Sequence, residues 1–176
     1  VMTSPLSGTM VPGCSSRTEI QGIGSQSYPV EWFTRSGLGG RFSSMLKFAG
    51  WDGVVIEGAA DTPVWVDIRN EAVTIRECSE LSLWGMDTFE CQQAIWDFVA
   101  GSRRYEEWIT PHADGDARST QRPAVLVIGP AGEHLSRLAV IQHDASNTSG
   151  QGGFGAVWGS KNLKAVSVIG TGSVKI

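Results

Sequence analysis

The chain has 176 residues, of which 41% are apolar, including seven Trp and six Phe, so it can bury one domain core or two closely packed halves. The formal charge of −4 arises without a long run of either sign, which argues against a nucleic-acid partner. The sequence has no apolar stretch of the roughly 20 residues that a membrane helix needs and no signal-peptide pattern, which indicates a cytoplasmic protein without a membrane partner. Its three cysteines lack C-x-x-C spacing, which indicates reduced thiols and argues against a disulfide framework or a zinc site.

The first third of the chain is expected to combine strands with one short helix. Alternating polar and apolar residues predict strands over 17–21 and 29–34. Apolar residues at 3.6-residue spacing predict a helix over 42–49. Residues 53–58 are β-branched, bounded by glycine and apolar on both faces, which indicates a central strand.

A hairpin and a capped helix are predicted next. The alternating segments 63–68 and 72–76 are separated by three turn-forming residues and indicate a β-hairpin. Asp87 and Glu90 have the spacing of a capping box at the start of a helix. One apolar stripe follows on that helix, formed by Cys91, Ile95, Phe98 and Val99.

The last part of the chain returns to β-structure after a polar stretch. Residues 101–123 are rich in Pro, Asp, Gly and Ser and are expected at the surface. Buried strands are predicted over 124–128 and 139–143, with a short helical piece over 131–138 between them. The expected fold class is therefore α+β, with mixed sheets and a few short helices.

Two copies of the pattern S-G-x-G-G, at 36–40 and 149–153, suggest an internal duplication. Each copy is followed by Phe, a short helical stretch and a β-branched segment that ends in glycine, at 54–58 and 166–170. Glycines before a helix permit positive φ and close approach, so successive N–H groups can converge on an anion. Two such loops would form two anion cradles.

These glycines have two other possible interpretations, a dinucleotide-binding loop and tight turns between packed backbones. Gly150, Gly152 and Gly155 match the G-x-G-x-x-G of a dinucleotide loop, but no acidic residue follows between Gly155 and Ile176 to bind a ribose. Dinucleotide binding is therefore not favoured. The glycines could also mark only tight turns where backbones pack closely.

Three motifs carry a family resemblance. They are LKFAGWDGVVIEG at 46–58, IGPAGEHL at 128–135 and GGFGAVWGSKNLKA at 152–165. In this order they resemble the N-terminal domain of the tungsten-dependent aldehyde ferredoxin oxidoreductase family, with a likeness that runs over about 5–174. It implies that 1–176 is a tungstopterin-binding domain, with the family's first strands before it and two helical domains after it.

The resemblance implies a tungsten (or molybdenum) ion held by two pterins, whose phosphates are linked through Mg²⁺. Arg17 would pair with a phosphate, the backbone carbonyls of Gly37 and Thr148 would face Mg²⁺, and Gly39 would approach the cofactor. No catalytic residue is expected in this chain. The full set of implied cofactor-binding residues is Arg17, Ser36, Gly37, Gly39, Gly40, Asn147, Thr148, Gly150, Gln151, Gly152 and Gly153.

This sequence departs from the family pattern at three of these positions. Family members often carry asparagine where this chain has Gly37, and arginine where it has Asn147 and Gln151. Losing two cations weakens a phosphate site unless another cation reaches it. The candidates for that role are Arg35, Arg41 and Lys161.

By resemblance, the whole enzyme oxidises aldehydes to carboxylic acids and passes electrons through a [4Fe–4S] cluster, with ligands outside this chain, to ferredoxin or an electron-transfer subunit. The chain alone is then expected to be inactive, and a homodimer is one arrangement that the resemblance allows. Two alternatives stay open: an aromatic acyl-CoA reductase on the same scaffold, and a degenerate, cofactor-free scaffold or interaction module. The scattered His112, His134 and His143 do not suggest a metal site.

Overall fold

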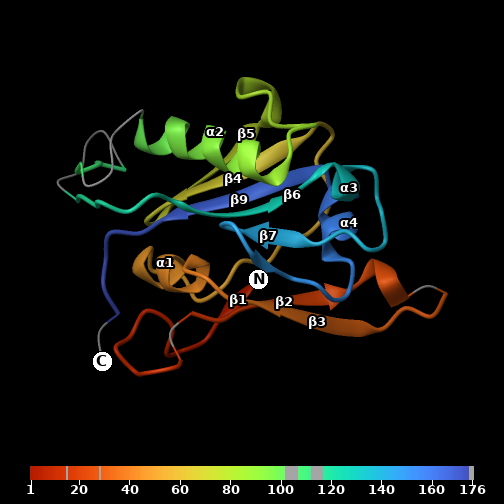
Figure 1. Cartoon of the computed structure of the whole chain (residues 1–176), viewed down its shortest axis with the longest axis horizontal. Coiled ribbons are helices and arrows are strands. Elements are labelled where there is room, and N and C mark those ends of the chain that lie inside the picture. Colours follow the sequence, from red (N-terminus) through yellow and green to blue (C-terminus); the bar gives the residue numbers. More distant parts are fainter. Residues whose placement is uncertain (15, 28, 102–106, 112–116, 175–176) are drawn as a thin grey trace.

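The computed structural model of the protein describes residues 1–14, 16–27, 29–101, 107–111 and 117–174. The fold is α+β, as predicted, and consists of a three-stranded sheet and a six-stranded sheet (Figure 1). The helices α1 (Phe42–Phe48) and α4 (Phe154–Gly159) pack on the central strands of the larger sheet. Figure 1 shows helix α2 on the far side of that sheet from α1.

The smaller sheet is antiparallel, in the order β1 (Met2–Thr3), β2 (Thr18–Ile23) and β3 (Phe33–Leu38). The strand predicted over 17–21 is confirmed as β2. The strand predicted over 29–34 is misplaced, because β2 pairs with Phe33 through Leu38. Strand β3 therefore includes Ser36 and Gly37, the first two residues of the first glycine segment.

The larger sheet has the order β5-β4-β9-β6-β7-β8, and only the β4–β9 pair is parallel among its described ladders. The predicted hairpin and the predicted buried strands are confirmed. Strands β6 and β9 are buried along their whole length, since α2 packs on β6 while α1 and α4 pack on both strands. The strands are β4 (Val64–Arg69), β5 (Ala72–Glu77), β6 (Ala124–Ile128), β7 (Ile141–His143), β8 (Asn147–Thr148) and β9 (Leu163–Ile169).

Helix α2 (Thr88–Ala100) has the capping box that its sequence predicts. Asp87 accepts hydrogen bonds from the N–H groups of Phe89 and Glu90, at 2.8 and 2.9 Å. The carboxylate of Glu90 in turn accepts from the Asp87 N–H, at 3.4 Å. Three N–H donors at the start of the helix, those of Asp87, Phe89 and Glu90, are thus satisfied locally. Three members of the predicted stripe are buried, namely Cys91, Ile95 and Val99.

The central strand predicted over 53–58 is wrong. Gly53 makes only an isolated bridge with Met2, and Val54 exchanges backbone hydrogen bonds with Val1, at 2.8 and 2.9 Å. The side chain of Val55 is 80% exposed. The apolar residues of this segment line a groove. Their apolar pattern therefore does not mean that the segment is a buried central strand.

The internal duplication is not confirmed. Both glycine segments lead into a short helix, as predicted, but α4 continues into β9 whereas α1 continues into the segment over 53–58, which is not a strand. The helix predicted over 131–138 is also shorter than expected, because α3 (Pro130–Glu133) ends before Leu135, whose φ is +59°.

The remaining connections are short. Two 3-10 turns, η1 (Ser25–Ser27) and η2 (Cys78–Glu80), follow β2 and β5. Within the polar stretch predicted over 101–123, Ile109 and Ser119 form an isolated bridge, while residues 102–106 and 112–116 lie outside the described residues. None of the helices among the described residues is long and apolar enough to cross a bilayer.

A buried ion pair joins α3 to β9. The side chains of Lys164 and Glu133 are 0% and 3% exposed and form a salt bridge. Lys164 Nζ also donates to the carbonyl of Met86, at 2.8 Å, and Glu133 accepts from the Gly85 N–H, at 2.9 and 3.0 Å. Both charges are therefore paired and hydrogen-bonded, which burial of a charge requires.

Removing Lys164 should destabilise the protein strongly. We expect Lys164→Met to lower the free energy of unfolding by about 3–5 kcal/mol, because Glu133 stays buried without its counter-ion. The double variant Lys164→Met/Glu133→Gln should recover part of this loss. The control is Lys161→Met on the same segment, outside the ion pair. Equal urea midpoints for the two single lysine variants would contradict the prediction.

Candidate functional site

The two glycine segments lie side by side where the sheets meet, at β3 and β8. Ser36 of the first segment accepts a hydrogen bond from the N–H of Gln151 in the second, at 3.2 Å, across 115 positions of the chain. Ser36, Gly37 and Thr148 come from strands, while Gly39, Gly40 and residues 149–153 form the connections to α1 and α4. The fold thus brings together the site residues that the sequence placed in two distant segments.

The first segment approaches β7 and β8 closely at Gly39 and Gly40. A Cβ at Gly39 would lie 2.9 Å from Asn147 Oδ1, and a Cβ at Gly40 would overlap the ring of His143. Gly40 also has a φ of +89°, a backbone conformation that residues other than glycine rarely adopt. Close backbone approach therefore explains both glycines.

The second segment makes an equally close contact with the turn after β2. A Cβ at Gly24 would overlap the carbonyl oxygen of Gly152, and a Cβ at Gly153 would overlap Ser25 Oγ. The N–H of Gly152 donates to Gln26 Oε1, at 2.9 Å. These contacts hold the start of α4 against the end of β2.

Three amides of the second segment donate to protein acceptors rather than to an open cradle. The N–H groups of Ser149, Gln151 and Gly152 bind the carbonyl of Ile141, Ser36 Oγ and Gln26 Oε1 respectively. Gly150 is exposed, and a Cβ there would meet nothing within 4 Å. Close packing of backbones thus accounts for Gly152 and Gly153. The amides of this segment do not all converge on one anion site, because three of them already bind protein acceptors.

Arg17 lies against the backbone of Gly37. Its Nε and Nη2 atoms are 2.5 Å from the position that a Cβ of Gly37 would occupy. The side chain is 64% exposed, and its ion pair with Glu19 is long, at 3.7 Å between Nε and Oε1. A solvated pair of this length holds the guanidinium weakly, so Arg17 can turn toward an anion beside Gly37.

Two of the cations suggested as substitutes for missing arginines are engaged elsewhere. Arg41 forms hydrogen bonds to both carboxylate oxygens of Asp144, at 3.2 Å each, and donates to the carbonyl of Pro123, at 2.8 Å. Lys161 Nζ donates to the carbonyl of Gly58, at 2.7 Å. Arg41 and Lys161 are therefore not placed to replace the missing arginines at a phosphate site.

His143 belongs to this junction, although its sequence context gives no signal of it. The ring is 0% exposed, Nδ1 lies 2.9 Å from the carbonyl of Val125, and Nε2 accepts from the Arg41 N–H, at 3.1 Å. Burial lowers the pKa of His143, although Asp144 opposes that shift. Its hydrogen-bond partner Arg41, which directly follows the first segment, is 102 positions away, so no local pattern could indicate this contact. Within the described part of the chain, no three His, Cys, Asp or Glu residues are grouped to bind a metal.

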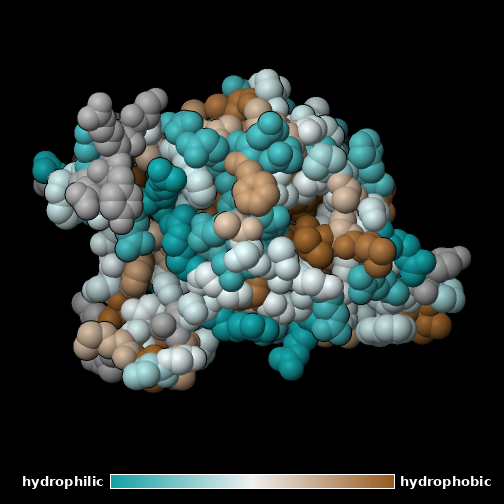
Figure 2. Space-filling model, in the orientation of Figure 1, coloured by the Kyte–Doolittle hydropathy of each residue, from teal (hydrophilic) through white to brown (hydrophobic). Residues whose placement is uncertain are grey.

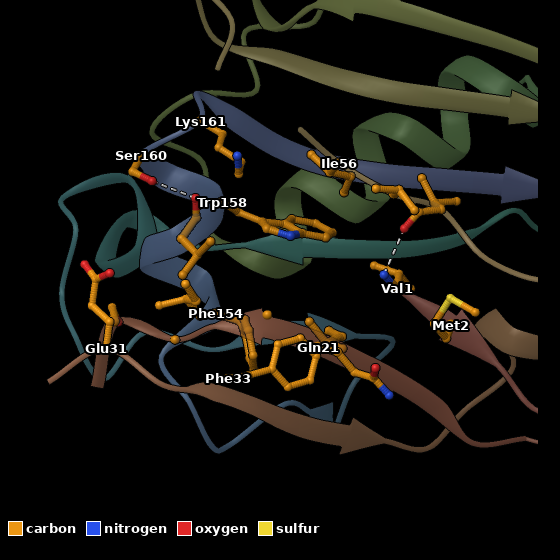
Figure 3. Close-up of a pocket in the computed structure, with 18 of the residues that line it drawn as sticks. Val1, Met2, Gln21, Glu31, Phe33, Ile56, Phe154, Trp158, Ser160 and Lys161 are labelled. Carbon is orange, nitrogen blue, oxygen red and sulfur yellow. Dashed lines mark hydrogen bonds between the residues drawn. The ribbon is translucent and has the colours of Figure 1, made fainter. Parts of the chain in front are cut away.

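A separate groove of about 930 Å³ lies between β2, the segment 54–56 and α4 (Figure 3). Phe33, Phe154 and Trp158 lie together in it, so its lining is largely apolar. None of the site residues predicted from sequence lines it. On the face shown in Figure 2, apolar surface is confined to small patches within a polar and neutral surface.

Residues 1–170 match the family described as "Aldehyde ferredoxin oxidoreductase, N-terminal domain". The tungsten-containing aldehyde ferredoxin oxidoreductase of Pyrococcus furiosus is 34% identical over 176 residues, which are 100% of this chain and 25% of that protein. The enzyme of the same description from Pyrococcus abyssi is 36% identical over 174 residues, 99% of this chain and 24% of that protein. An aliphatic sulfonate oxidoreductase, WOR-like subunit, of Pyrococcus furiosus is 34% identical over 172 residues, 98% of this chain and 25% of that protein.

A solved structure has the same fold. It is the active site complex BamBC of benzoyl coenzyme A reductase in complex with 1,5 dienoyl-CoA, with 29% identity and a TM-score of 0.80. The match covers 98% of this chain and 22% of that chain. The present chain thus spans about a quarter of the length of the relatives that it matches.

Gly40→Ala should disrupt the junction between the glycine segments. We expect it to cost about 1–3 kcal/mol more than Gly50→Ala, because a Cβ at Gly40 overlaps His143 in addition to the strain of positive φ. Gly50 is a matched control, since its φ is +94° and a Cβ there would meet nothing within 4 Å. Urea unfolding measures the difference, and equal losses would show that backbone strain alone matters.

The buried His143 should make the stability depend on pH. Its pKa is lower when folded than its ordinary value of 6.5, so the unfolded chain binds the proton more readily. The stabilisation is therefore complete above about pH 6.5 and is lost as the pH falls through the folded pKa. We expect urea midpoints to fall as the pH drops below 6.5, and to fall less steeply in His143→Gln. The exposed-site variant His134→Gln should keep the parental slope; a parental slope in His143→Gln would contradict the assignment.

Proposed function

Because this chain belongs to the aldehyde ferredoxin oxidoreductase family, we propose that it forms the cofactor-binding base of a tungsten (or molybdenum) bis-pterin oxidoreductase. The observation that carries this proposal is the position of Arg17 against Gly37, next to the point where β3 contacts β8. Both residues implied as Mg²⁺ ligands, Gly37 and Thr148, come from these two adjoining strands.

The residues present fit the phosphate end of such a cofactor. A guanidinium binds phosphate oxygens through two parallel N–H groups, and Arg17 is exposed enough to do so. Backbone carbonyls are hard oxygen ligands that suit Mg²⁺ regardless of the side chain, so glycine at position 37 keeps this capacity. Thr148 is exposed at the end of β8, and Asn147 lies against Gly39.

In this proposal the chain binds and orients, and the bound metal centre supplies the two-electron redox chemistry. Arg17 would hold a phosphate of the cofactor, and the carbonyls of Gly37 and Thr148 would hold Mg²⁺. Cys78 and Cys91 are buried, burial raises the pKa of each thiol to about 12, and no group of three possible metal ligands lies among the described residues. Cluster ligands are therefore assigned to other domains of the parent protein.

The whole enzyme would oxidise an aldehyde to a carboxylic acid in the cytoplasm, with ferredoxin or an electron-transfer subunit as acceptor. A second candidate is reduction of an aromatic acyl-CoA, favoured by the fold match to the benzoyl coenzyme A reductase complex at a TM-score of 0.80. Both candidates share this scaffold, so the fold of this domain does not discriminate between them. The substrate-lining walls and the contact with an electron carrier, or with a second copy, would come from the rest of the protein.

Metal and pterin analysis of the full-length protein tests the proposal. We expect tungsten or molybdenum by plasma mass spectrometry, and two pterins per metal by fluorescence after oxidative release. Activity with aldehydes, compared with activity on an aromatic acyl-CoA, distinguishes the two candidates. Absence of metal and pterin from protein matured in its native host would favour the cofactor-free scaffold.

Arg17→Gln should lower the cofactor content of the full-length protein. Loss of charge-assisted hydrogen bonds of about 1.5–3 kcal/mol weakens phosphate binding roughly tenfold to a hundredfold. The matched control is Arg118→Gln, an exposed arginine on the segment that pairs with Ile109. Unchanged metal and pterin per chain in Arg17→Gln would remove Arg17 from the site.

A further inference from the structure

His143 connects elements that come from both halves of the candidate site. It is the last residue of β7, in register with Leu126 of β6 and with Asn147 of β8. Its ring also contacts the connection between β3 and α1, through the Arg41 N–H. A fully buried side chain with polar contacts to separate segments is suited to fix their spacing.

The hydrogen bonds of His143 define which ring nitrogen carries the proton. The carbonyl of Val125 can only accept, so Nδ1 carries the hydrogen at 2.9 Å. The N–H of Arg41 can only donate, so Nε2 must offer a lone pair at 3.1 Å. The ring is therefore neutral, and both of its nitrogens are used by backbone groups.

The ring is also confined by packing. Phe42, the first residue of α1, meets it edge-on, with ring centroids 6.1 Å apart and an interplanar angle of 77°. The backbone of Gly40 also comes so close that a Cβ there would overlap the ring. His143 thus holds the residues on either side of Arg41, which are the end of the first glycine segment and the start of α1.

We propose that neutral His143 is a positioning residue, which holds the segment carrying Gly37, Gly39 and Gly40 at a fixed distance from β8, the strand of Asn147 and Thr148. It contacts neither phosphate nor metal, and acts through the Arg41 N–H. The consequence for cofactor binding rests on the proposed function, whereas the connection between the two segments does not.

Protonation would exchange the partner of Nε2. Among the described residues, the charged groups that act on the ring are Asp144 and Arg41. Asp144 Oδ2 lies 3.2 Å from Nε2 and is itself held by the Arg41 guanidinium. A protonated Nε2 would donate to this carboxylate and leave the Arg41 N–H without its acceptor. The connection should therefore open at acidic pH.

Two substitutions separate the two nitrogens in the full-length protein. His143→Gln places an amide oxygen near the position of Nε2 and can still accept from the Arg41 N–H, whereas His143→Asn reaches only the position of Nδ1 and can still donate to the Val125 carbonyl. Each variant removes one hydrogen bond and makes a cavity. Hydrogen exchange of peptides that contain Arg41, measured by mass spectrometry, reports the connection without any cofactor, and metal and pterin per chain are measured alongside.

We expect about tenfold faster exchange at Arg41, and less bound cofactor, in His143→Asn but not in His143→Gln. In the unsubstituted protein, protection at Arg41, corrected for intrinsic exchange, should fall as the pH drops below 6.5 toward the lowered pKa of the folded His143, and this fall should be absent in His143→Gln. Equal exchange in the two variants, or protection independent of pH in the unsubstituted protein, overturns the inference. If both variants fail to fold, the pH profile of the unsubstituted protein decides alone. Lack of metal and pterin in every protein contradicts the proposed function but leaves the exchange result valid.

Discussion

The candidate site depends on the close approach of two backbone segments that are more than 100 positions apart in the chain. Ser36 receives a hydrogen bond from Gln151, and the Gly40 backbone meets the ring of His143 without room for a Cβ. Gly24 and Gly152 are equally close. Because the glycines remove side-chain bulk at these contacts, β3 and β8 can adjoin, and their carbonyls can contribute to one site.

Buried charge gives this arrangement a rigid support. Lys164 and Glu133, which belong to two of the three motifs that carry the family resemblance, form an ion pair that joins β9 to α3. Buried pairs of this kind are sensitive to the loss of either partner. These two motif residues therefore have a structural role, because their ion pair connects β9 to α3 in the interior of the fold.

The geometry also corrects the physical role first assigned to the glycine segments. Three amides of the second segment bind protein acceptors, so they are not free to surround an anion. What remains suited to a phosphate and Mg²⁺ is an exposed guanidinium at Arg17 and carbonyl oxygens on adjoining strands. The apolar groove beside α4 lies elsewhere and contains none of these residues.

Features that depend on neighbouring residues in the chain could be predicted from the sequence. They are the capping box of α2 at Asp87 and Glu90, the β4–β5 hairpin around Asn70, and the buried strands β6 and β9. The sequence also identified the two glycine segments. Three features came from long-range contacts instead: residues 54–56 line a groove, β3 starts at Phe33, and His143 binds the N–H of Arg41. The physical reason is that these outcomes depend on which distant strand supplies backbone partners, and a local pattern of polar and apolar residues does not encode that choice.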